Sequence, residues 1–204
     1  MARTDVQLML DAKAGDDSSF NVLLVKYRSP LVNFLYRMVR DRATAEDLAQ
    51  DVFLRVYRAR KQYTPSAKFT TWLFRIATNV ALNSVRDNRH QKMQVSLDAP
   101  VSTEQEFVAR DVPAREARID EQLLERDRVE FIQRAIASLP EKQRAAVLLH
   151  KYEEMDYAEI AETLDCTEAA LKSLLFRAYE NLRVQLAPLI TQPVTQRAGE
   201  GRPS

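Results

Sequence analysis

Apolar residues recur at helical spacing through most of this 204-residue chain, and that periodicity constrains the fold more than any other feature. In residues 44–61, Leu48, Val52 and Val56 repeat every four positions, with Phe53 beside them. Such spacing places apolar side chains on one face of an α-helix. No segment shows the sustained alternation and turn dipeptides of β-hairpins. The sequence therefore predicts an all-α fold.

Polar residues and prolines predict where the helices of the first half begin and break. Pro30 should bend or restart the helix over residues 20–40, because proline has no amide proton to donate. Pro65 and Ser66 should make residues 62–69 a loop. Side-chain oxygens at helix starts accept backbone amide protons, so the expected N-caps are Asp17 or Ser18, Thr44, and Thr70 or Thr71.

The C-terminal half also has helical spacing, with one helix expected to stop before Pro140. Asp156 and Glu159 form a D-x-x-E pattern that resembles a capping box. The short helix that they open is followed by a tight turn at residues 165–167 and a long helix capped by Thr167. This order matches the helix-turn-helix plan, although an ordinary helical hairpin has the same spacing.

The two helices of this pair should share an apolar core, while the second helix presents a different set of side chains outward. The expected core residues are Ile160, Ala161, Leu164, Leu171, Leu175, Ala178 and Leu182. The expected outward residues are Lys172, Ser173, Phe176, Arg177 and Arg183. Lysine and arginine can reach phosphates or guanine edges, serine a phosphate or base edge, and phenylalanine a thymine methyl group. Cys166, in the turn, is expected to pack rather than to react.

The formal net charge of +1 conceals an uneven distribution of charge along the chain. Residues 55–92 carry nine basic side chains and one acidic one, interleaved with five aromatic rings. That composition is typical of a track for a nucleic-acid backbone, although a solvated basic face is the alternative. Residues 93–125 carry eight acids against three arginines and lose the helical periodicity. They are expected to form a partly disordered linker.

One helix in the basic segment should have two different faces. Over residues 69–86 the apolar positions Leu73, Ile76, Ala77 and Val80 point one way. A second stripe, spaced by four, four and three residues, contains Arg75, Asn79, Asn83 (or Leu82 in its place) and Arg86. One face can therefore pack while the other offers amides and guanidinium groups.

Several kinds of chemistry are poorly supplied in this sequence. Its three glycines form no phosphate-binding loop, and its two histidines and single cysteine support neither a metal site nor an acid–base centre. No apolar run approaches the roughly 20 residues of a membrane span, and the N-terminus lacks the order of a secretory signal. We therefore expect a cytoplasmic protein that is not an enzyme, with no cofactor, no metal and no small-molecule substrate.

The two halves together resemble the bacterial RNA polymerase sigma factors of the extracytoplasmic-function group. Residues 20–59, which include the motif EDLAQDVF, and residues 69–86 look like conserved region 2 of that family. Residues 139–183 look like region 4. The resemblance is specific, because two dissimilar motifs occur in the family's order with an acidic linker between them.

The resemblance implies two small helical domains joined by a flexible acidic linker, the second containing a helix-turn-helix. The implied segments are residues 1–92 as the region 2 domain, 93–125 as the linker, 126–190 as the region 4 domain and 191–204 as a flexible tail. The implied partners are core RNA polymerase, through its clamp coiled coil and its flap, promoter DNA and an anti-sigma factor. The competing hypothesis is a stand-alone helix-turn-helix regulator, which would dimerise and read a palindromic duplex by itself.

The resemblance also assigns roles to residues of region 2. EDLAQDVF is similar to the segment that grips the polymerase clamp, which gives that role to Asp47, Gln50 and Asp51; the acids also suit the start of a helix. The loop and the helix after it resemble the element that melts and reads the −10 promoter region. The residues given that role are Lys68, Phe69, Trp72, Arg75, Asn79, Asn83 and Arg86.

Capture of a flipped base costs on the order of a few kcal/mol, so the binder needs stacking rings and amides that read base edges. Phe69 and Trp72 are the expected rings, and Asn79 and Asn83 the expected amides, although Trp72 fits a core position equally well. In region 4, the residues expected to contact the −35 duplex are Lys172, Ser173, Phe176 and Arg177. Leu174 and Tyr179 stand where the family commonly has arginine, which implies a weaker phosphate grip or a changed −35 preference.

Overall fold

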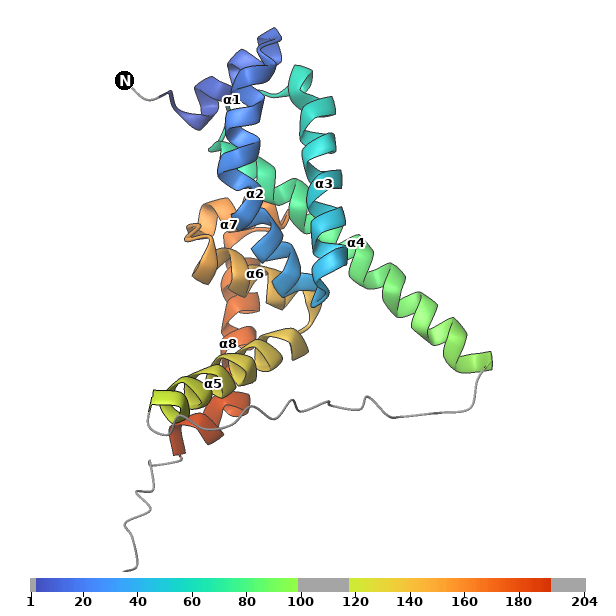
Figure 1. Ribbon diagram of the computed structural model, residues 1–204, viewed down its shortest axis with the longest axis vertical. Helices are drawn as coiled ribbons and strands as arrows, with labels where there is room; N and C mark the ends of the chain where they lie inside the picture. Colours follow the sequence, from blue (N-terminus) through green and yellow to red (C-terminus); the bar gives the residue numbers. More distant parts are fainter. Residues whose placement is uncertain (1–2, 99–117, 192–204) are drawn as a thin grey trace, which may run out of the picture.

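The computed structural model describes residues 3–98 and 118–191, and within those ranges every regular element is a helix (Figure 1). The elements are α1 (Asp5–Ala14), α2 (Asp17–Val39), α3 (Arg42–Ala59), the 3-10 helix η1 (Arg60–Gln62), α4 (Phe69–Asp98), α5 (Arg118–Ser138), α6 (Glu141–Tyr152), α7 (Tyr157–Thr163) and α8 (Glu168–Thr191). The predicted all-α fold is confirmed. Most of the predicted linker, and the predicted tail beyond residue 191, lie outside the described residues.

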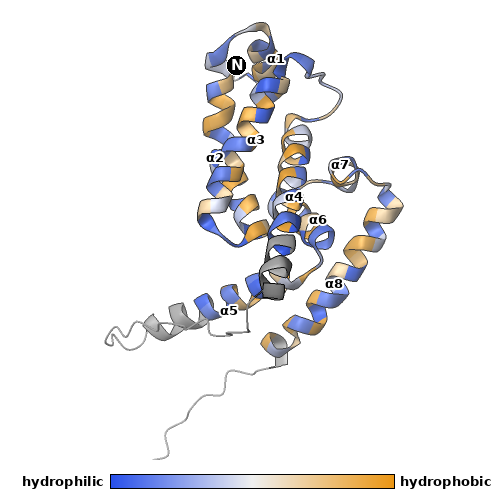
Figure 2. Ribbon diagram, turned by 90° about the vertical axis from the view of Figure 1, so that its right-hand side faces the viewer, coloured by the Kyte–Doolittle hydropathy of each residue, from blue (hydrophilic) through white to orange (hydrophobic). Residues whose placement is uncertain are grey.

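The first bundle consists of α1 to α4. α2, α3 and α4 pack against one another, and α1 lies against α2 and η1. The helices turn their apolar residues inward, and Figure 2 shows the resulting mixture of hydrophilic and hydrophobic residues along α2 and α3. The predicted stripe on α3 is buried at Val52, Phe53 and Val56 and partly buried at Leu48. The other sides of α3 and α4 therefore remain available for partners.

α1 was not predicted from the sequence. Short-range signals mark its ends: the Thr4 hydroxyl accepts the amide proton of Gln7 at 3.2 Å, and Gly15 ends the helix with a φ of 110°. Glycine adopts that left-handed backbone without strain. Leu8 and Met9 of α1 are buried. A stripe this short gives little periodic signal, which is why the helix was missed.

The predicted starts of three helices were wrong by one to three residues. Asp16 caps α2 and accepts the amide proton of Ser18 at 3.0 Å, while Asp41 caps α3 and accepts that of Thr44 at 2.7 Å. Aspartate is at least as good an N-cap as serine or threonine, so the upstream acid takes the position in both helices. α4 begins at Phe69, which places the predicted caps, Thr70 and Thr71, inside its first turn.

Two other expectations concern helix boundaries. α2 continues through Pro30 as one helix, so of the two alternatives, a bend or a restart, the restart is wrong. The helix survives the lost hydrogen bond because Leu31, Phe34 and Leu35 are completely buried in the turns that follow. The linker predicted over residues 93–125 is also shorter than expected, since α4 reaches Asp98 and α5 begins at Arg118.

The second bundle, α5 to α8, contains the predicted helix-turn-helix. The capping box is present: the Glu159 amide donates to the Asp156 carboxylate at 2.9 Å, and the Asp156 amide donates to the Glu159 carboxylate at 3.0 Å. Thr167 caps α8 by accepting the amide proton of Ala170 at 3.2 Å. The expected core is confirmed, because all of its members are buried: Ile160, Ala161, Leu164, Leu171, Leu175, Ala178 and Leu182.

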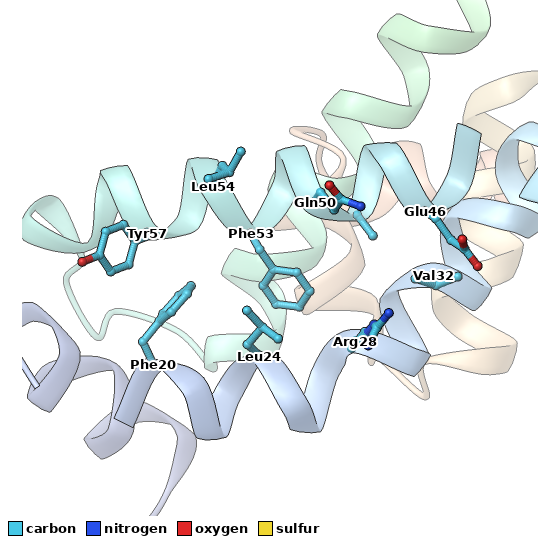
Figure 3. A pocket seen from close by; sticks show the side chains of 10 residues that line it. Phe20, Leu24, Arg28, Val32, Glu46, Gln50, Phe53, Leu54 and Tyr57 are labelled. Atoms are coloured by element: carbon cyan, nitrogen blue, oxygen red, sulfur yellow. The ribbon is translucent and has the colours of Figure 1, made fainter. Parts of the chain in front are cut away.

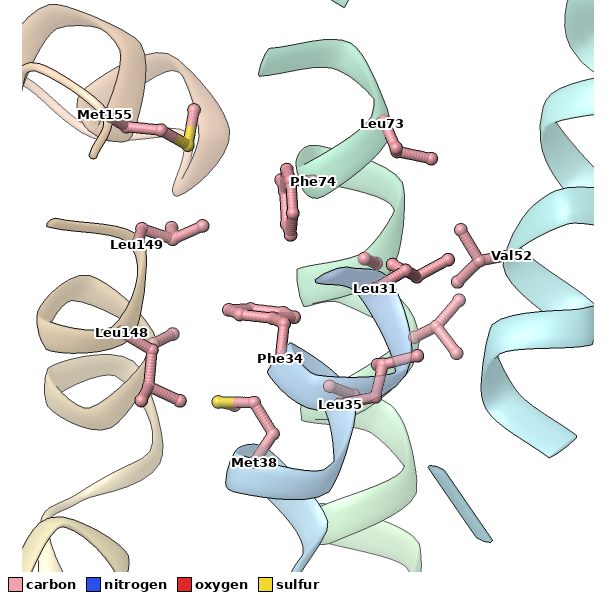
Figure 4. Close-up of a cluster of buried hydrophobic side chains, with 14 of the residues drawn as sticks. Leu31, Phe34, Leu35, Met38, Val52, Leu73, Phe74, Leu148, Leu149 and Met155 are labelled. Atoms are coloured by element: carbon pink, nitrogen blue, oxygen red, sulfur yellow. The ribbon is translucent and has the colours of Figure 1, made fainter. Parts of the chain in front are cut away.

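The two bundles pack against each other through one continuous apolar core (Figure 4). Phe34 and Met38 of α2 lie between α4 and α6, and they face Leu148 and Leu149 of α6. The Phe34 ring meets the Phe74 ring edge-on, with centroids 5.3 Å apart. The helices of the second bundle are therefore held directly against the helix that carries the predicted DNA-reading residues.

A half-buried arginine joins the bundles at the same place. The Arg144 guanidinium donates to the carbonyl of Met38 at 2.5 Å, to that of Leu139 at 3.2 Å and to that of Ala137. Burial lowers the pKa of this guanidinium, although Glu141 nearby opposes the effect. Three backbone acceptors offset part of the loss of hydration at the two terminal nitrogens, while the buried Nε has no hydrogen-bond partner in the described residues. Arg144 thus fixes the start of α6 to the end of α2.

Candidate nucleic-acid and polymerase interfaces

Buried aromatic rings hold both ends of the loop over residues 63–68. Tyr63 and Phe69 are each 2% exposed, and their ring centroids lie 6.5 Å apart. Trp72, in the first turn of α4, packs on both rings, with centroids 5.0 Å from Tyr63 and 6.2 Å from Phe69. Thr64 is exposed between these anchors, as are the next two residues. The loop therefore projects an exposed tip from a packed aromatic base.

The predicted role of Phe69 as a stacking surface conflicts with its burial. Its ring also packs on Tyr27 of α2, at a centroid distance of 5.4 Å, so it has no face left for a base. Phe69 is the first apolar residue of α4, and the helix turns it into the bundle. Trp72 is only partly buried, and with Thr64 and Arg75 it lines a cavity of about 210 Å³. Of the two predicted rings, only Trp72 is accessible.

The polar stripe on α4 is exposed, as its spacing predicted. Arg75, Asn79, Asn83 and Arg86 are all exposed, whereas the apolar positions of the same helix face the core. Asn83 also borders a shallow groove of about 300 Å³ between α3 and α4. Two carboxamides and two guanidinium groups thus follow one side of α4, where hydrogen-bond donors and acceptors can meet the edges of unpaired bases.

The residues predicted to contact polymerase lie on the outer side of α3. Asp47 and Gln50 are exposed, while Asp51 is partly buried and pairs with Arg55 at 2.9 Å. Asp51 and Arg55 also line the groove that contains Asn83. The residues predicted to contact polymerase and those predicted to read the −10 strand therefore meet at the α3–α4 boundary.

An apolar groove of about 460 Å³ runs between α2 and α3, and the sequence analysis did not foresee it (Figure 3). Phe20 and Leu24 of α2 and Phe53 of α3 form its floor, and Gln50 stands at its edge. Leu54, also at the edge, is 53% exposed. Periodicity identifies Phe53 as a core residue but cannot show that the helices leave a gap beside it.

The four predicted −35 residues lie on one side of α8. Lys172, Ser173, Phe176 and Arg177 are exposed, and the Phe176 ring is 68% exposed. A phenylalanine with that much apolar surface in water gains from contact with a partner. The Ser173 hydroxyl donates to the carbonyl of Ala169 at 3.1 Å, which fixes its direction along the helix.

Leu174 and Tyr179, where α8 departs from the family's usual arginines, pack partly against the core. Their spacing places them at the two borders between the buried side of α8 and its exposed side. The Tyr179 hydroxyl lies 2.8 Å from Nδ1 of His150 in α6. Burial and the charge of Lys151 lower the pKa of His150. Leu174 and Tyr179 therefore stabilise the bundle. The exposed side of α8 keeps two cations, Lys172 and Arg177.

α7 of the second bundle covers part of the predicted strand-reading element. Glu159 pairs with Lys68 at 2.9 Å, and its carboxylate lies 3.5 Å from the Thr71 hydroxyl. Lys68 keeps its proton more firmly here, because the hydrogen bond and charge of Glu159 raise its pKa. Glu162 lines the cavity that contains Trp72. The sequence showed Glu159 only as part of a capping box.

Family models match both bundles of this chain. One described as "Sigma-70 region 2" matches residues 23–91, and one described as "Sigma-70, region 4" matches residues 130–182. The RNA polymerase sigma-H factor of Pseudomonas aeruginosa is 31% identical over 191 residues, which cover 92% of this chain and 96% of the relative. This chain belongs to the sigma-70 family. The extracytoplasmic-function sigma-E factor of Escherichia coli K12, 31% identical over 187 residues with the same coverage, places it in that group.

Solved structures share the fold of this sigma factor. The structure of CnrH in complex with the cytosolic domain of CnrY has a TM-score of 0.62 at 20% identity and covers 89% of this chain and 96% of that one. The sigma factor RpoE of Bartonella quintana, in complex with the anti-sigma factor NepR, has a TM-score of 0.60 at 22% identity, covering 82% and 96%. The likeness confirms the helical architecture in two regions.

The family excludes the competing hypothesis of a stand-alone regulator, because the matches include region 2 as well as the helix-turn-helix. The relatives are sigma factors, which are not enzymes. Within residues 3–98 and 118–191, no helix is long and apolar enough to cross a membrane. The same described part holds no cluster of three or more acidic, histidine or cysteine side chains suited to a metal ion.

Proposed function

We propose that this sigma factor binds core RNA polymerase through α3 and reads promoter DNA at two places, the −10 element with α4 and the −35 element with α8. The exposed stripe of Asn79 and Asn83 beside the packed apolar face of α4 is the observation that carries this proposal. We place the activity in the cytoplasm, where polymerase and chromosome meet. The chain itself catalyses no reaction in this scheme.

Strand capture at −10 would use the elements around the loop. Trp72 offers the accessible ring, Asn79 and Asn83 offer the base-reading amides, and Arg75 and Arg86 offer positive charge for the phosphates. Phe69 supports Trp72 from beneath instead of stacking on a base. Lys68 lies beside this surface, and its pair with Glu159 would compete with a phosphate for the ammonium group.

Polymerase binding would use the outer side of α3 together with the groove beside it. Asp47 and Gln50 supply polar contacts, and the exposed Leu54 and the apolar floor of the groove supply area to bury. A helical partner fits such a groove by laying an apolar face into it. The clamp coiled coil of core polymerase is helical, so groove and acids together suit it better than the acids alone.

Duplex binding at −35 would place the exposed side of α8 in the major groove. Arg177 and Lys172 reach guanine edges or phosphates, Ser173 a phosphate, and Phe176 a thymine methyl group. The second bundle is also proposed to contact the polymerase flap. An anti-sigma factor is the proposed inhibitor, since the solved relative from Bartonella quintana is bound to one.

Run-off transcription tests the proposal. Purified chain is mixed with bacterial core polymerase and a library of genomic fragments, and transcripts are mapped to their start sites. The proposal expects promoter-specific transcripts that disappear without the chain. Absence of specific transcripts from every fragment, with a known sigma factor active in the same assay, would count decisively against it.

A further inference from the structure

We infer that α1 positions the −10 loop, residues 63–68, for capture of an unpaired base, and that Lys13 is the positioning residue. The inference rests on the proposed function of α4 and extends it to a helix that lies outside the matched segment. The region 2 match begins at residue 23, whereas α1 spans Asp5–Ala14. Nothing in the matched segment accounts for what this helix does.

The first contact is at the start of the loop. Lys13 Nζ donates to the backbone carbonyl of Tyr63 at 2.8 Å, across fifty positions of sequence. Tyr63 is the last buried residue before the exposed tip. The Tyr63 amide donates to the carbonyl of Arg60 at 3.2 Å, so η1 ends and the loop begins at Tyr63. The lysine therefore fixes the point from which the loop departs.

The second contact supports the far end of the loop. The Asp5 carboxylate, at the start of α1, accepts a hydrogen bond from the Tyr27 hydroxyl at 2.5 Å and one from Lys26 at 2.6 Å. Tyr27 in turn packs its ring on Phe69, where the loop ends. The two ends of α1 thus hold the two ends of the loop.

The aromatic base carries this effect to the accessible ring. Trp72 packs on both anchors, Tyr63 and Phe69, and lines the cavity beside the loop. A shift of the Tyr63 backbone would move one wall of that cavity and the ring surface next to it. Preorganised stacking surfaces bind more tightly because less order is lost on binding.

The fold itself does not depend on this lysine. α1 is held in the bundle by Leu8, Met9 and Ala12, which are buried. Lys13 is an exposed residue in the last turn, and its amino group contacts the loop. Positioning of the loop and docking of the helix can therefore be separated by mutation.

The test uses three variants of the full chain. Lys13→Met removes the amino group and keeps a side chain of similar length, while Lys13→Arg keeps a charged donor. Arg3→Ala is the matched control: it removes one positive charge and the bonds of Arg3 to Asp11 and Ser19, and it leaves the loop untouched. Trp72 is the only tryptophan of the chain, so acrylamide quenching of the free protein reports on that ring alone.

Open-complex formation is then measured with core polymerase on a promoter found by run-off transcription, using permanganate reactivity of unpaired thymines. Lys13→Met should lower the open fraction about fivefold, which corresponds to about 1 kcal/mol, a typical net hydrogen-bond contribution. It should also increase the quenching of Trp72. Lys13→Arg should restore both values, and Arg3→Ala should match the wild type. Core affinity should not change, and any fall in melting temperature should be no larger than that of Arg3→Ala, which also loses side-chain hydrogen bonds.

Three outcomes would overturn the inference. The first is a Lys13→Met variant that matches the wild type in both readouts. The second is a reduced open fraction together with a salt slope of DNA binding lowered by about one, the mark of a direct phosphate contact. The third is a reduced open fraction together with weaker core binding and a melting temperature well below that of Arg3→Ala, the mark of a purely structural role. Failure of the wild-type chain to open any promoter would instead remove the proposed function, and the inference with it.

Discussion

Arg177 is the residue on α8 whose removal should weaken −35 binding most clearly. It is exposed on the same side as Phe176, and its fork of donors matches a guanine edge. Arg177→Ala should cost roughly 1–3 kcal/mol of −35 affinity. Fluorescence anisotropy of a labelled promoter fragment titrated with holoenzyme measures this affinity. Arg183→Ala is the control, because Arg183 lies nearer the end of α8 beside Glu180, at 3.8 Å; equal losses for both variants would argue against a reading role for Arg177.

Glu153 links the packing of the bundles to pH. Burial raises the pKa of its carboxyl to about 7, although Arg37 of α2 acts to lower it. Because the folded-state pKa is raised, the contribution of Glu153 to the free energy of unfolding is most favourable below its ordinary unfolded value of about 4.5 and is lost as the pH rises through about 7.

Glu153→Gln should therefore stabilise the protein at pH 8 and change little at pH 4.5. After allowance for its partial exposure, we expect a gain of about 1 kcal/mol in the free energy of unfolding at pH 8. Urea denaturation at the two pH values measures the difference. An equal effect at both would show that the carboxyl does not titrate as its burial implies.

At the scale of elements, the apolar groove between α2 and α3 leads to a prediction that the acidic residues of α3 alone would not give. Leu54 is exposed at its edge, so Leu54→Lys should leave the fold intact while placing a charge where the polymerase helix would lie. We expect core affinity to fall about tenfold, or roughly 1.4 kcal/mol. Competition binding to core polymerase measures this. Val129→Lys, on the exposed side of α5, is the control and should bind normally; wild-type affinity for Leu54→Lys would exclude the groove from the interface.

The sequence predicted the elements that have long periodic stripes and missed those defined by a few contacts. α3, α4 and α8 were recognised because their buried positions recur over several turns, and the exposed side of α4 followed from the same spacing. α1 has a buried stripe of only three residues. The N-caps of α2 and α3 depend on which of several nearby polar side chains accepts the first amide protons. The sequence placed all seven −10 residues together but could not show that Phe69 turns inward. Burial depends on the neighbouring helix, in this case on Tyr27 of α2.

Contacts between the bundles were beyond sequence reasoning for the same physical reason. Glu159 fits a capping box whether or not a second bundle is present, and its pair with Lys68 exists only in the packed molecule. Arg37 illustrates the same point, since its guanidinium lies 4.0 Å from the ring of Tyr152 in α6. Long-range pairs of this kind leave no periodic trace.

At the scale of the whole molecule, the packed arrangement is too small to serve both promoter elements. The described residues, 3–98 and 118–191, would as a compact body have a radius of gyration of about 15 Å. The −10 and −35 elements are separated by about 25 base pairs, or roughly 85 Å of duplex at 3.4 Å per base pair. Under the roles proposed for α4 and α8, we therefore expect the two bundles to separate and the Lys68–Glu159 pair to break when the sigma factor engages its promoter.

That separation can be followed between the bundles by energy transfer. Cys166 is the only cysteine of the chain and is exposed in the second bundle, and a second cysteine can replace the exposed Asn33 of α2. We expect high transfer in the free protein and a large decrease once core polymerase and promoter are added. Adding promoter DNA without core polymerase is the control and should leave energy transfer high. Unchanged transfer in the holoenzyme would mean that the bundles stay packed while they act.

The most direct test of the account replaces both carboxamides on the exposed side of α4. The chain with Asn79→Ala and Asn83→Ala is combined with core polymerase, and permanganate reactivity records how much of the −10 region is unpaired. Both residues are exposed, so melting temperature and core affinity should match the wild type. We expect the open complex to decrease about tenfold or more, near 1.4 kcal/mol, since each edge contact discriminates bases by that order. Promoters that open equally well without the two amides would contradict it.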